Sequence, residues 1–202
     1  MWDPMVFGKQ FEMENGRGRK VVMQKRAYFD SFWGDGWPTL SFLEPYFLKP
    51  SSERWFFESG NDSAGLDIQG VLGTGHLEEY KGRIDVHLSM WGDPDHGVLL
   101  IYEKYGGGFN ETYSSKGDMR RIHEWVRTLH SDARPVGLYI PFAEAWKAVK
   151  EFIETDGELP KSIAWVANRD LPENTFPDPH DIVLPGEPGN AGPVAIIKPS
   201  QG

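Results

Sequence analysis

The stretch from Ile140 to Val166 repeats its apolar residues at the spacing of an amphipathic helix and then changes to a strand pattern. The apolar positions on one helical face are Phe142, Ala145, Trp146, Val149, Phe152 and Ile153. Gly157 favours a left-handed end to this helix, and Pro160 prevents its continuation. Ser162–Val166 (SIAWV) predicts a short β-strand. We expect the helix, its end and the strand to form one compact unit.

A strict alternation of apolar and polar residues follows the chain from Ile84 to Met90 and predicts a half-buried strand. After a turn-rich loop at Gly92–Gly97, the run Val98–Glu103 is apolar on both faces, which is typical of a central strand covered on both sides. Gly106–Gly108 then turns the chain, so Phe109–Tyr113 can pair back. The short connections predict an antiparallel meander.

Weaker patterns complete the predicted fold. A second helix is expected at Asp118–His130, with Asp118 as its N-cap. In the first helix, Lys147–Glu151 and Lys150–Glu154 are expected to form ion pairs on a solvated face. Phe29 to Trp37 is expected to be an irregular aromatic segment. Further strands are predicted at Val21–Met23, Thr39–Glu44, Trp55–Phe57 and Gly65–Val71.

Together these elements predict an α+β fold: an antiparallel β-sheet (meander) with two helices packed on one face and a Pro/Gly-rich C-terminal tail. We divide the chain into an N-terminal aromatic- and Gly-rich segment packed on the domain (1–36), an α+β domain (37–167) and an extended or partly disordered tail (168–202).

The net charge and the cysteine content of the chain exclude several classes of protein. The net charge of −9 argues against nucleic-acid binding, because phosphate binding needs basic clusters, but it suits docking on a basic partner. The chain has no cysteine, which excludes disulfides and thiolate chemistry and fits a cytoplasmic location. It contains neither a signal peptide nor an apolar run long enough to cross a bilayer, so we expect no membrane partner.

No catalytic motif is recognisable. His76-Leu77-Glu78 matches half of a zinc deaminase signature, but the cysteines that would hold the metal are missing. Asp93, Asp95 and His96 cluster in a Gly- and Pro-rich loop, where a structural turn explains them better than a metal site. We therefore expect no catalytic residues, no metal and no cofactor, and a protein that binds rather than catalyses. A hydrolase with an unrecognised carboxylate site at Glu78, Glu79 and Asp85 remains an alternative.

Three blocks of sequence carry a family resemblance: Gly92–Tyr105 (GDPDHGVLLIYEKY), Gly108–Gly117 (GFNETYSSKG) and Ile140–Val166. Trp37–Phe42 (WPTLSF) adds an expected earlier strand. The pattern resembles the first named family of bacterial polymorphic-toxin immunity proteins, over Trp37 to Val166. Several members neutralise deaminase-fold toxins that attack nucleic acid. A more general superfamily of acidic α+β immunity proteins is an alternative within the same class.

The resemblance implies a protein that binds a cognate toxin domain with a basic substrate-binding surface and blocks its active site or substrate groove. On the meander, we expect the toxin-binding residues to be Asp93, Asp95, Glu103, Tyr105, Phe109, Glu111 and Tyr113. Ordinary sheet residues and a solvated turn would show the same pattern, so the alternative that these residues have no binding role stays open. An adaptor or chaperone for a secreted effector is the other functional alternative.

Overall fold

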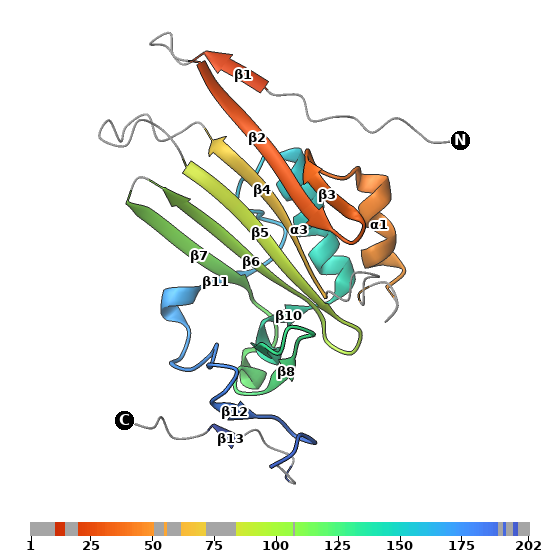
Figure 1. Cartoon of the computed structure of the whole chain (residues 1–202), viewed down its shortest axis with the longest axis vertical. Helices are drawn as coiled ribbons and strands as arrows, with labels where there is room; N and C mark the ends of the chain where they lie inside the picture. The colour runs from red at the N-terminus through yellow and green to blue at the C-terminus, as the bar shows by residue number, and fades with distance from the viewer. Residues whose placement is uncertain are drawn as a thin grey trace.

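A computed structural model describes residues 11–14, 20–50, 55, 62–71, 84–106, 108–189, 192 and 196–197. Across these ranges the chain forms one antiparallel sheet of nine strands with two α-helices (Figure 1). The main path of the sheet runs β1-β2-β4-β5-β6-β7-β11, while β3 pairs with β2 and β10 pairs with β6. The predicted α+β class and the antiparallel meander are confirmed.

The strands of this sheet are β1 Phe11–Glu14, β2 Lys20–Phe29, β3 Phe32–Asp35, β4 Ser63–Val71, β5 Ile84–Asp93, β6 Gly97–Gly106, β7 Phe109–Ser115, β10 Tyr139–Ile140 and β11 Trp165–Ala167. The helices are α1 Leu40–Leu48 and α3 Phe142–Glu154. Short 3-10 turns lie at η2 Met119–Arg121, η3 Val136–Leu138 and η4 Asn168–Asp170. Two small ribbons, β8 Trp125–Arg127 with β9 Ala133–Pro135 and β12 Ile182–Val183 with β13 Ile196–Ile197, lie apart from the sheet.

The main core lies between the sheet and the two helices. The predicted inward positions of β5 are all buried: Ile84, Val86, Leu88 and Met90. Against them pack the buried side chains of both helices: Leu43, Tyr46 and Phe47 from α1, and Ala145, Ala148, Val149 and Phe152 from α3. Burying large aliphatic and aromatic side chains in this way is the main source of folding free energy.

Helix α3 ends as its sequence predicts, in a left-handed turn. Asp156 has φ 53° and Gly157 has φ 92°. The Gly157 N–H donates to the Phe152 carbonyl at 2.9 Å, the six-to-one bond of a Schellman motif. A Cβ on Gly157 would lie 2.7 Å from Ile68 of β4, so glycine also permits close packing on the sheet.

Two predicted elements are wrong, because packing in the two cores overrides their local patterns. Thr39–Glu44 is not a strand: α1 begins at Leu40, and the Thr39 hydroxyl caps it by accepting the Phe42 N–H at 3.3 Å. Asp118–His130 is not a helix: it forms η2 and then strand β8. Asp118 does act as the N-cap of η2, accepting the Arg120 N–H at 3.2 Å.

Three smaller predictions also need correction. The segment expected to be irregular is a hairpin in which the end of β2 pairs with β3, and Tyr28 lies opposite Trp33. Trp55 is helical, so the predicted strand is wrong at this residue, and residues 56 and 57 lie outside the described part. Lys147 pairs with Glu144 at 2.6 Å rather than with Glu151, while the Lys150–Glu154 pair forms at 3.7 Å.

Glu151 instead joins α3 to the segment that leads into β11. Its carboxylate accepts the backbone N–H groups of Lys161 and Ser162, both at 2.9 Å. The hydrogen bond from Lys161, followed by the contacts with Ser162, lowers the pKa of Glu151 below its ordinary value of 4.5. A group whose pKa is lowered by folding stabilises the fold at pH above its unfolded value, and this contribution disappears as the pH falls through the folded value.

We therefore expect the stability difference between the wild type and Glu151→Gln to be constant above about pH 6 and to shrink towards about pH 3. Urea unfolding at several pH values measures it. A Glu154→Gln variant is the control, since Glu154 is an exposed carboxylate on the same helix. A difference that grows at low pH would contradict the assignment.

The opposite face of the sheet is covered over only part of its area. Leu99 and Ile101 of β6 form a second core there with Ile122, Leu138 and Tyr139. The cover comes from the chain after β7 and from the C-terminal segment, which contributes Leu171 and Phe176. Because side chains of β6 alternate between the two cores, the prediction that this strand is covered on both sides is confirmed for Val98 to Tyr102.

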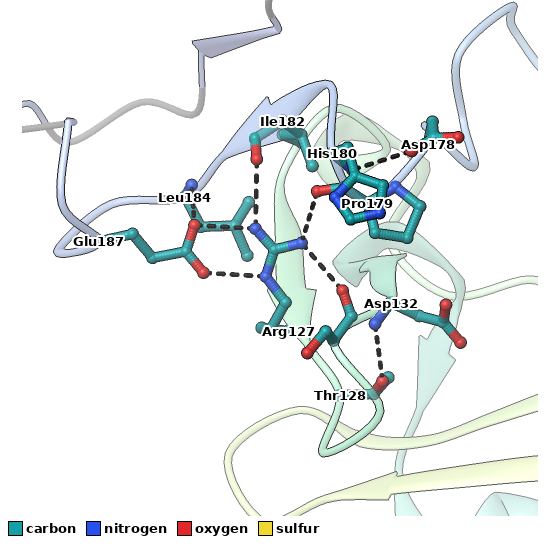
Figure 2. A network of polar contacts seen from close by, with 10 residues as sticks. Arg127, Thr128, Asp132, Asp178, Pro179, His180, Ile182, Leu184 and Glu187 are labelled. Atoms are coloured by element: carbon teal, nitrogen blue, oxygen red, sulfur yellow. Dashed lines mark hydrogen bonds and ion pairs between the residues drawn. The ribbon is translucent and has the colours of Figure 1, made fainter.

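The described C-terminal segment is fastened to the β8–β9 ribbon by the guanidinium of Arg127 (Figure 2). Its Nε and Nη2 donate to the two carboxylate oxygens of Glu187, each at 2.8 Å. Its remaining N–H groups reach the carbonyls of Ser131, Pro179 and Ile182 at 3.0, 3.3 and 3.2 Å. Below this contact, Ile182 and Leu184 are buried with Trp125 and Ala133.

Candidate functional site

A row of charged residues crosses the uncovered part of the sheet face that lies opposite the helices. Cross-strand pairing places the members in order from β3 to β6: Asp35, Arg26, Asp67, His87 and Glu103. Directly paired residues of antiparallel strands point to the same side of the sheet. At a strand spacing of about 4.8 Å, the row spans about 19 Å. We call this set the charged row and the uncovered side of the sheet the open face.

A compact cluster lies at the centre of the open face. His87 Nδ1 contacts the Asp67 carboxylate, and the ring of Tyr28 stacks on the His87 ring at a centroid distance of 6.2 Å. Tyr28 lies across β4 at Gly65, where an added Cβ would be 2.2 Å from the tyrosine ring. Gly65 is therefore the residue that allows this ring to lie flat over the sheet.

The pKa of the Tyr28 hydroxyl is raised in this cluster. Burial is the largest cause of its raised pKa, and the nearby carboxylates of Asp67 and Glu103 add to it, while a hydrogen bond with Ser89 acts in the other direction. Within the described residues, no cation forms an ion pair with Glu103. The centre of the open face thus carries negative charge that the fold does not neutralise.

Two aromatic side chains project from the open face on either side of this centre. Trp33 on β3 is 84% exposed, and Tyr105 on β6 is 46% exposed. Trp33 contacts Tyr28 at a centroid distance of 6.4 Å, and Tyr105 pairs across strands with Asp85. Exposed rings beside unneutralised charge are typical of protein-binding surfaces.

The structure divides the predicted toxin-binding residues among three places. Glu103 and Tyr105 point to the open face, since they follow Ile101 at alternate positions of β6. Tyr113 pairs with Tyr102 and packs on the main core, so it belongs to the helix side, and Glu111 lies on the same side, opposite Lys104. Phe109 pairs with Gly106 at the start of β7, and its side chain lies outside the described part.

Asp93 and Asp95 form a third location, at the β5–β6 turn. The Asp93 carboxylate Oδ1 accepts the N–H groups of Asp95 and His96, both at 2.9 Å, and lies 2.7 Å from His96 Nδ1. The structural-turn interpretation of this loop is therefore supported. Asp93 pairs with Gly97, and Tyr105 is eight residues further along β6, which is about 27 Å away.

A small hollow of about 170 Å³ lies beside β7, where β11 ends. Glu111 and Tyr113 line it together with Asn168 and Arg169 of η4. The Ser114 hydroxyl donates to the Asn168 side-chain oxygen at 2.7 Å and fixes η4 against the strand. Two of the predicted residues thus line one hollow, whose size suits a single side chain rather than a substrate.

The described residues do not bring the candidate catalytic groups together. No three His, Asp or Glu side chains are grouped to hold a metal ion in the described ranges. Ser89 is buried beneath Tyr28, so it is not exposed as a nucleophile. Of the carboxylates considered for a hydrolase, Asp85 accepts the Gly70 N–H at 3.2 Å, and residues 78 and 79 lie outside the described part.

Sequence reasoning missed most of the open face: Arg26, Tyr28, Trp33, Asp67 and His87. The polar residues of the alternating strand Ile84–Met90 were a usable signal, because Asp85 and His87 must point away from its apolar side. The residues that lie beside Asp85 and His87 depend on the register between strands, and the pattern of one strand does not specify that register.

One of the comparisons with known proteins finds a match. The model of the family described as Immunity protein Imm1 matches residues 73–167. The matched range includes the three main blocks of the resemblance and leaves Trp37–Phe42 outside. No curated protein and no solved structure matches the chain. No α-helix in the part of the chain that the structure describes is long and apolar enough to cross a membrane.

Proposed function

From the match of residues 73–167 to the model of the Imm1 family of immunity proteins, we infer that this chain binds and neutralises a cognate bacterial toxin in the cytoplasm of the cell that makes it. The family match is the observation that carries the proposal. Among the described residues no group of His, Asp or Glu side chains could hold a metal ion, which is consistent with inhibition by binding.

The toxin we propose is an enzyme that acts on nucleic acid, of the deaminase type, with a basic substrate groove. Such a groove attracts an acidic protein, and a net charge of −9 raises the rate of association with it. The chain then blocks the toxin by occupying its active site or substrate groove. Protection of a cell requires sub-nanomolar affinity, a binding free energy of about −12 kcal/mol or stronger.

The test uses the gene directly upstream, in which we expect a large secreted protein with a toxic C-terminal domain. Induction of that domain in cells should stop growth, and co-expression of this chain should restore it. With purified proteins, one equivalent of the chain should abolish deamination of single-stranded oligonucleotides by the domain. Restored growth without inhibited deamination would remove the deaminase proposal alone. A stable complex that leaves toxicity unchanged would identify an adaptor or chaperone instead and overturn neutralisation.

A further inference from the structure

We propose that the open face of the sheet is the surface that docks on the toxin, and that the surface it binds is rich in lysine and arginine. This inference rests on the proposed function and adds the place and chemistry of the contact. It assigns no toxin contact to the β5–β6 turn, because Asp93 already accepts the hydrogen bonds of that turn.

The first support is the balance of charge on the open face. On the charged row, the described carboxylates of Asp35, Asp67 and Glu103 lie beside one described guanidinium, that of Arg26, which lies 3.5 Å from Asp35. Three carboxylates and one guanidinium give these described residues a formal charge of −2, with His87 left out of the count. Carboxylates repel phosphate, so a nucleic acid or another acidic surface is excluded, and a basic protein surface is complementary.

The second support is the position of the exposed rings. Trp33 and Tyr105 lie on different strands on opposite sides of the charged row, so a partner that contacts both must cover the row between them. Interfaces of high affinity place Trp and Tyr anchors beside charged pairs that lose water on binding. Trp33 contacts Tyr28, and the missing side chain at Gly65 lets the Tyr28 ring lie flat on the sheet.

The third support is that two helices cover the opposite face of the sheet. There, α1 and α3 cover the sheet, and the exposed side of α3 pairs its charges internally, Glu144 with Lys147 and Lys150 with Glu154. Lys25 on that side pairs with Asp156. On the open face, Glu103 forms no ion pair with a cation among the described residues.

The experiment measures binding of purified variants to an inactive variant of the upstream toxin domain, with growth rescue as a second readout. Trp33→Ala and Tyr105→Ala should each weaken the affinity by about 10-fold to 100-fold, mainly through faster dissociation. Glu103→Lys should lower the association rate as well and reduce its dependence on salt.

Matched controls separate this surface from general effects. Leu129 is also 46% exposed, so Leu129→Ala removes an equally exposed side chain elsewhere. Glu154→Lys changes the net charge as Glu103→Lys does, but on α3. Both controls should bind within about twofold of the wild type, and thermal unfolding should show that all variants are folded.

Three outcomes would contradict this inference, and only one of them would also contradict the proposed function. If the wild type binds and protects while Trp33→Ala, Tyr105→Ala and Glu103→Lys do so equally well, the open face is not the interface and the proposed function stands. Equal weakening by Glu154→Lys and Glu103→Lys would show charge attraction without a defined docking face and would also overturn this inference. A wild type that neither binds nor protects would remove the proposed function, and this inference with it.

Discussion

Replacing Trp55 by alanine is expected to lower the free energy of unfolding by about 4 kcal/mol, the range for a large buried aromatic residue. Trp55 is fully buried, and its Nε1 donates to the Tyr46 carbonyl at 2.8 Å. The ring contacts Phe47 at a centroid distance of 5.5 Å and lies over β5 at Gly92, where a Cβ would be 2.0 Å from it. Its loss leaves a cavity between α1, α3 and the sheet.

Thermal unfolding followed by near-ultraviolet circular dichroism measures this effect, and a chain of this length should lose about 8–16 °C. Trp33→Ala is the matched control, because the same side chain is removed from an exposed position, and its melting temperature should change little. Gly92→Ala should also destabilise, since the added methyl group collides with the Trp55 ring. Equal melting temperatures for the two tryptophan variants would show that Trp55 is not buried as described.

Arg127→Ala is expected to release the C-terminal segment and to cost about 3 kcal/mol, because it removes the two hydrogen bonds from Arg127 to the Glu187 carboxylate and those to three carbonyls. Both side chains are less than one third exposed, at 23% and 32%, so water replaces the lost contacts only in part. Release of the C-terminal segment exposes Trp125, which is buried with Ile182 and Leu184.

Limited proteolysis measures the release as faster cleavage between residues 171 and 187, and the fluorescence of Trp125 should shift to longer wavelength. Arg127→Lys keeps the charge but loses the forked geometry, so an intermediate effect is expected. Arg120→Ala is the control, because Arg120 lies on the surface and pairs only with the nearby Asp118 among the described residues. Unchanged cleavage in Arg127→Ala would mean that the apolar contacts alone hold the segment.

The centre of the fold was predictable because its patterns are strong and local. Strands β5, β6 and β7 and helix α3 follow from alternation, a two-sided apolar run and a long amphipathic repeat. The end of α3 was predictable from Gly157 because its φ of 92° lies in the left-handed region that glycine tolerates.

The two misassigned segments show where local patterns are insufficient. Leu40–Leu48 contains Pro45 and aromatic residues, yet a capped helix forms because Leu43, Tyr46 and Phe47 reach the core from one side. In Asp118–His130 the helical spacing of Met119, Ile122 and Val126 is real, but they enter the second core from a 3-10 turn and a strand. Tertiary packing decides both cases.

The candidate site was only partly predictable for a related reason. Glu103 and Tyr105 were identified from their strand, but Tyr113 and Glu111 next to them in the meander point to the other face. The charged row exists only when five strands are in register, and two of them, β2 and β3, come from the segment that carried the weakest pattern. The domain boundaries at residues 36 and 168 stay predictions.

The order of strands in the sheet has a consequence for synthesis. Along the path β1-β2-β4-β5-β6-β7, neighbouring strands follow one another in the order of synthesis, with β3 and α1 between β2 and β4. Strand β11 joins β7 only after β8 to β10 and α3 have been made. A sheet of this kind grows by short loop closures, so each new strand finds its neighbour already in place as the chain leaves the ribosome. The open face, which is built from β2 to β6, is therefore synthesised before the last quarter of the chain is translated, so the surface proposed to bind a toxin can form early.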